Sequence, residues 1–156
     1  MKQITQRSNF RVYLNKNQIS LFERTVGCAR FIWNKRVASF NSKDNTSDKT
    51  IKELKIEFPF LSEVPYNALE QCLQNWNQTK KQFFSKTRKT KIGRPKFKSK
   101  KQSEQSFTVS YNGFSLKKEY LSISKFGKIK VVGLEELLTL SNVSTLTLTR
   151  KASGKY

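Results

Sequence analysis

The sequence predicts an α+β fold in which a helical bundle interrupts a small β-barrel. Apolar residues recur every three or four positions over the first half of the chain, and at every second position from residue 106 onward. A short alternating segment, residues 9–14, also opens the chain and reads as a strand. This strand would complete the barrel by pairing with strands more than ninety residues later. At 156 residues, the chain suits one compact module.

Three helices are expected before residue 85. Asn15 is suited to cap the first, whose apolar positions fall at helical spacing through Val37. A polar loop follows, in which Thr46 or Ser47 could cap a second short helix within residues 49–58. The third helix, about five turns long, has Pro65 in its first turn. Its apolar stripe consists of Leu69, Cys72, Leu73, Trp76 and Phe83.

Five short segments in the last third of the chain are rich in β-branched and aromatic residues and are separated by Gly, Asn or Ser. We expect each to form a strand. They are residues 106–111, 113–118, 119–124, 127–132 and 144–150.

Positive charge is concentrated between the helices and these strands. The chain has 31 Lys and Arg against 11 Asp and Glu, a net charge of +20. Such an excess repels itself unless a polyanion offsets it, so we expect nucleic acid as the partner, bound through its phosphates. The alternative is a solvated linker, but Gly93, Pro95 and a buried-looking Phe97 interrupt the run as in an ordered segment. The predicted backbone-binding residues are Lys80, Lys81, Lys86, Arg88, Lys89, Lys91, Arg94, Lys96, Lys98, Lys100 and Lys101.

The sequence offers little for catalysis. Without histidine, the chain has no Ser-His-Asp triad, no Cys-His pair and no His-based metal site. Asp44 and Asp48 share one polar loop and the glutamates are scattered, so we expect no metal site and no enzyme activity from this chain alone. The chain contains no phosphate-binding Gly-rich loop, so we expect no cofactor. Cys28 and Cys72 lie in apolar patterns and are expected to be reduced core thiols.

The chain shows no secretory signal and no apolar stretch of ~20 residues. We therefore expect a protein of the cytoplasm, associated with the nucleoid if bacterial, with no membrane partner.

Four blocks of the chain, residues 10–34, 60–84, 93–107 and 144–156, resemble in order the TnpB (OrfB) family. This family comprises the RNA-guided nucleases of bacterial insertion sequences, related to type V CRISPR effectors and long described as transposases with a helix-turn-helix region. The resemblance implies that the barrel is the family's OB-like wedge domain and that the helices are its recognition lobe. The RuvC-like nuclease domain and zinc ribbon of the family have no counterpart in these residues.

The resemblance also divides the chain into four parts. The first wedge strand would occupy residues 1–15, the recognition lobe 16–87, a basic connection 88–103 and the remaining wedge strands 104–156.

The resemblance further implies a surface that reads DNA at the start of the third helix. Tyr66, Asn67 and Glu70 align with positions that contact a short target-adjacent DNA motif, with Ser47 and Ile51 nearby. Glu70 stands where the family leads us to expect Gln, and this leaves the motif preference open, because Gln pairs with adenine whereas Glu accepts from cytosine. Without the resemblance, these residues would be read as caps or ordinary surface.

Tyr111 and Phe114 flank a turn, where each could either stack on a base or pack in a hairpin core.

Taken together, the sequence predicts a nucleic-acid-binding N-terminal module that holds guide RNA and a DNA motif. Two alternatives remain open: a subunit completed by a separate RuvC-domain polypeptide, and the product of a decayed transposase gene.

Overall fold

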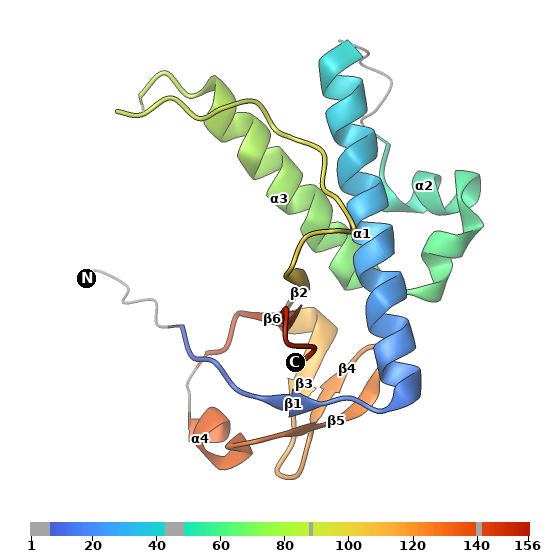
Figure 1. Ribbon diagram of the computed structural model, residues 1–156, viewed down its shortest axis with the longest axis vertical. Coiled ribbons are helices and arrows are strands. Elements are labelled where there is room, and N and C mark those ends of the chain that lie inside the picture. The colour runs from blue at the N-terminus through green and yellow to red at the C-terminus, as the bar shows by residue number, and fades with distance from the viewer. Residues whose placement is uncertain (1–6, 43–48, 88, 140–141) are drawn as a thin grey trace.

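The computed structural model describes residues 7–42, 49–87, 89–139 and 142–156. Most of the helical structure lies in one half of the molecule and the strands lie in the other, as Figure 1 shows. Helix α1, Lys16–Ser42, runs through both halves, with α2, Ile51–Glu57, and α3, Tyr66–Phe84, beside it. A 3₁₀ turn, η2, Pro59–Glu63, joins α2 to α3.

Helix α1 begins after Asn15, as predicted. The Asn15 Oδ1 atom accepts the backbone N–H of Gln18 at 2.9 Å, while Gln18 Oε1 accepts the backbone N–H of Asn15 at 3.0 Å. The two side chains therefore satisfy each other's backbone donors, as in a capping box. The Gln18 amide nitrogen also donates to the carbonyls of Phe126 at 3.0 Å and Lys128 at 2.7 Å. This buried amide fixes the start of α1 on a turn far downstream in sequence.

Helix α2 begins after Thr50, so the predicted cap at Thr46 or Ser47 was wrong. The Thr50 hydroxyl accepts the backbone N–H of Glu53 at 3.3 Å, and Glu53 Oε2 accepts that of Thr50 at 2.7 Å. This Thr-x-x-Glu pair is a capping box. Thr46 and Ser47 lie outside the described residues.

Helix α3 follows Pro65, which stands just before the first turn instead of within it. The predicted stripe largely faces the core, because Leu69, Cys72 and Trp76 are buried and Leu73 and Phe83 are half-buried.

The described strands form two antiparallel sheets. The first has the order β1-β5-β4-β3, and the second pairs β2 with β6. Val12 lies opposite Val131, which confirms that the opening strand pairs with the C-terminal segments, although it shortens to two residues. Closure of these sheets into a barrel, and the predicted domain borders, stay predictions. The strands are β1, Val12–Tyr13; β2, Gln105–Ser110; β3, Phe114–Leu116; β4, Leu121–Ile123; β5, Gly127–Val131; and β6, Thr145–Arg150.

Two short helical elements lie among the strands. They are the 3₁₀ turn η3, Tyr111–Gly113, and helix α4, Leu134–Thr139, which the periodicity did not predict. Leu134 and Leu137 are the buried residues of α4, one turn apart on the same face. None of the described helices is long and apolar enough to cross a membrane.

A single hydrophobic core connects the two halves through α1. On the sheet side, the fully buried ring of Phe22 lies 5.7 Å from that of Phe107 and 5.1 Å from that of Tyr156. On the helical side, Trp33 meets Trp76 edge to face at 5.3 Å. The same helix thus contributes to both halves.

The two cysteines belong to this core as free, buried thiols. The Cys72 thiol donates to the carbonyl of Ala29 at 3.2 Å, and burial raises the pKa of this thiol to about 11. Burial also raises the pKa of Cys28.

Candidate nucleic-acid interface

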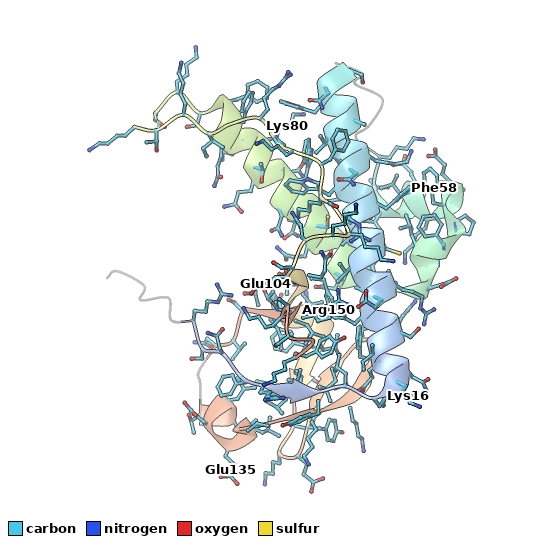
Figure 2. All side chains as sticks on the ribbon, viewed as in Figure 1. Lys16, Phe58, Lys80, Glu104, Glu135 and Arg150 are labelled. Carbon is cyan, nitrogen blue, oxygen red and sulfur yellow. The ribbon has the colours of Figure 1, made fainter. Side chains whose placement is uncertain are left out.

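Residues 80–101, called here the basic segment, begin on the last turn of α3 and then return toward α1 (Figure 1). They contain 11 basic residues and no acidic one. From Lys89 to Ser99 the chain adopts neither helix nor strand. Nitrogen-tipped side chains project from the loop beyond α3, past Lys80 (Figure 2). Arg88 lies outside the described residues.

Two side chains of α1 hold the returning part of the segment by its backbone. The indole nitrogen of Trp33 donates to the carbonyl of Lys96 at 2.9 Å. The Asn34 amide donates to the carbonyl of Lys98 at 3.0 Å and accepts the backbone N–H of Lys98 at 2.8 Å. Pro95, just before these contacts, is buried. The basic segment is therefore docked on the helix at this point, which agrees with the prediction of an ordered segment.

The fixed backbone leaves most of the cationic side chains in solvent. Lys98 and Arg94 are exposed as well, although the Lys98 Nζ atom lies 4.1 Å above the Trp33 ring and Arg94 lies 5.4 Å from the centre of the Phe40 ring. Within the described part of the chain, the ion pairs join other residues, such as Arg24 with Glu63 and Lys151 with Glu104, and none uses a cation of the basic segment. The other exposed lysines of the segment are Lys81, Lys86, Lys89, Lys91, Lys96, Lys100 and Lys101, while Lys80 is half-buried.

The positions predicted to read DNA are not equally available. Tyr66 is 47% exposed, with the Lys55 ammonium 5.0 Å from its ring centre, and Glu70 is half-buried nearby on α3. Ile51, in contrast, is 3% exposed, because it forms the apolar face of α2 together with Leu54. We therefore leave Ile51 out of the proposed surface. Ser47 lies outside the described residues, and the roles of Tyr66 and Glu70 stay predictions.

Asn67 is engaged within the protein. Its Oδ1 atom accepts the backbone N–H of Ser110 at 2.7 Å and the Ser110 hydroxyl at 3.2 Å, while its Nδ2 atom lies 3.0 Å from the same hydroxyl. A Cβ atom on Gly113 would come within 2.8 Å of the Asn67 side chain, so the turn after β2 needs a glycine there. Asn67 thus joins the start of α3 to the end of β2, a role that the sequence did not reveal.

The exposed aromatic residues differ from the prediction at one position. Phe97 is 57% exposed, whereas the sequence suggested a buried ring. Tyr111 is 67% exposed, and Phe114 is half-buried against the hydrophobic core. Stacking of a base on Tyr111 or Phe114 stays a prediction.

Among the residues that the structure describes, no group of three Cys, Asp or Glu side chains is placed to hold a metal ion.

Comparison with known proteins bears on the family. A family model described as a helix-turn-helix domain, that of OrfB from IS605, matches residues 1–40. The resemblance to the OrfB family is confirmed. A Streptomyces pristinaespiralis protein, named as a candidate RNA-guided DNA endonuclease, is 26% identical over 168 residues. The alignment covers all of this chain and 41% of that protein, so the chain spans about two fifths of its relative's length.

The part of the chain that matches the OrfB model contains β1 and nearly all of α1. It therefore includes Trp33 and Asn34, the two side chains that hold the basic segment. The part of the chain that matches the model thus carries the two side chains that support its most cationic part.

Proposed function

We propose that this chain is a nucleic-acid-binding module of an OrfB-like protein. Its basic segment binds the phosphate backbone of a guide-like RNA, and the start of α3 contacts a short DNA motif. One observation carries the proposal: a run of exposed lysines, none of them in an ion pair with another described residue, lies on a backbone that Trp33 and Asn34 fix to α1. The name of the Streptomyces relative supports RNA and DNA as the partners. The proposal assigns binding, and no catalytic step, to these residues.

The physical basis is the release of counterions. Each phosphate that a lysine neutralises frees condensed cations, so the logarithm of affinity falls with the logarithm of salt concentration, with a slope of roughly −0.7 per contact for single strands. A pre-ordered segment also raises the affinity, because its backbone loses little conformational freedom on binding.

The test compares two variants of equal net charge. In the first, four exposed lysines of the basic segment, Lys89, Lys91, Lys96 and Lys100, become Gln. In the control, four exposed lysines elsewhere, Lys16, Lys52, Lys117 and Lys118, become Gln. Binding of a labelled hairpin RNA is titrated at several salt concentrations.

We expect the first variant to flatten the salt slope by roughly 3, the sum for four lost contacts, and the control to change it by less than about 1. Equal changes in both variants would show that the total charge, and not the basic segment, sets the affinity. Absence of salt-dependent binding by the unmodified protein would refute the proposed function.

A further inference from the structure

Phe97 is an exposed aromatic residue whose ring has no partner within the described part of the chain. Most other exposed aromatic rings are covered in part by a neighbouring ring or cation. The pairs are Tyr13 with Arg11 at 5.1 Å, Phe60 with Phe31 at 5.2 Å, Tyr66 with Lys55 at 5.0 Å and Phe84 with Phe83 at 5.1 Å. Phe97 and Tyr111 have neither kind of partner among the described residues.

The backbone on both sides of Phe97 is fixed. Lys96 accepts a hydrogen bond from the Trp33 indole, and Lys98 exchanges two hydrogen bonds with the Asn34 amide. Phe97, between them, nevertheless stays 57% exposed instead of joining the core. Full burial of a Phe side chain stabilises a protein by ~1.5–3 kcal/mol, so this placement forgoes part of that gain. The fold thus displays the ring from a rigid support.

The surroundings of the ring indicate what can cover it. Within the basic segment, each residue adjacent to Phe97 is a lysine, and no acidic residue occurs between Lys80 and Lys101. An aromatic face among cations suits a nucleotide, because the base stacks on the ring while its phosphates meet the lysines. An unpaired base is required, since the bases of a duplex already stack on each other and separating them costs a few kcal/mol.

We propose that Phe97 stacks on an unpaired nucleobase, so that the basic segment binds single-stranded nucleic acid in preference to a duplex. This inference rests on the proposed function, because the same segment supplies the phosphate contacts. It adds a contact that reads the presence of a base but not its identity, since every base has an aromatic face.

The test uses four probes of ~12 nucleotides, a length within the range of known single-strand sites. They are an RNA strand, a DNA strand of the same sequence, an abasic strand of equal charge, and a blunt duplex. Phe97→Ala is compared with Tyr13→Ala, which removes another exposed ring, 53% exposed, on β1. Phe97→Trp keeps an aromatic face and adds a fluorescent reporter, whereas the natural Trp33 and Trp76 are buried.

We expect Phe97→Ala to weaken binding of both base-bearing strands about 5- to 150-fold, which corresponds to the ~1–3 kcal/mol of one stacked base. Its binding of the abasic strand and of the duplex should match that of the unmodified protein, which also shows that the variant is folded. Tyr13→Ala should leave all four affinities unchanged. Phe97→Trp should keep the affinity, and its added emission should be quenched by RNA and DNA strands but not by the abasic strand.

Two outcomes separate the inference from the proposed function. If the unmodified protein binds the abasic strand with a normal salt slope but Phe97→Ala changes nothing, the stacking role is refuted and the phosphate-binding role survives. If Phe97→Ala weakens base-bearing and abasic strands equally, the stacking role is likewise refuted. If the unmodified protein binds no probe, both proposals fail.

Discussion

Substitution of Asn67 distinguishes between two roles of this residue. The family resemblance assigns it to DNA reading, whereas the structure shows its amide hydrogen-bonded to Ser110. Replacing Asn67 by Ala removes these bonds and leaves the partly buried N–H of Ser110 without its acceptor. A typical hydrogen bond contributes ~0.5–1.5 kcal/mol net, and an unsatisfied buried donor costs ~1–3 kcal/mol. We therefore expect Asn67→Ala to lower the free energy of unfolding by about 2–3 kcal/mol.

The matched variant is Asn67→Asp. An Asp carboxylate can still accept from the N–H and the hydroxyl of Ser110, so most of the stability should remain. The same change alters base reading, since Asn donates to and accepts from adenine whereas Asp only accepts. A positioning role thus predicts a large loss for Asn67→Ala and a loss under about 1 kcal/mol for Asn67→Asp.

Urea unfolding followed by the fluorescence of the buried Trp33 and Trp76 measures both losses. In thermal unfolding, 2–3 kcal/mol corresponds to a decrease in Tm of about 4–12 °C for a chain of this size. If Asn67→Ala stays within about 0.5 kcal/mol of the unmodified protein, the bonds to Ser110 do not hold α3 on β2, and the reasoning fails.

Two further predictions concern local structure. Because burial raises the pKa of Cys72 to about 11, the thiol ionises in the unfolded state before it does in the folded state. The free energy of unfolding should therefore fall by about 2 kcal/mol as the pH rises from 9 to 11, and urea unfolding of Cys72→Ala should show a smaller decline over this range. Thr50→Ala removes the cap of α2 and should cost ~1 kcal/mol, with faster hydrogen exchange in residues 51–57. Unchanged exchange there would contradict the role of the capping box.

Local patterns in the sequence were sufficient to predict most of the helices and strands. Asn15 caps α1 as predicted because capping depends on residues only three positions apart. The same kind of signal, Thr50 with Glu53, marks the start of α2, but Thr46 and Ser47 before it are competing candidates for the cap. Helix α4 was not predicted, because a segment of six residues with two buried leucines is too short to show a helical period.

The candidate site was less predictable, since its geometry depends on residues far apart in sequence. The cations of the basic segment were evident from composition, but their support by Trp33 and Asn34 spans more than 60 positions. Phe97 was misjudged because composition cannot tell a buried ring from a displayed one. Asn67 was read by alignment with a family position, whereas its partner Ser110 lies 43 residues away.

Helix α1 determines how a bound nucleic acid would affect the rest of the chain. Its 27 residues extend about 40 Å, with the basic segment docked at Trp33 and Asn34 and the sheets packed around Phe22. The Gln18 amide adds a polar anchor to the carbonyls at the β5 turn. Because α1 contributes buried residues to one core that extends from the sheets to the other helices, the basic segment stays docked only while α1 stays folded. A ligand that binds the docked segment therefore stabilises the sheets as well, by an amount set by its concentration relative to its Kd.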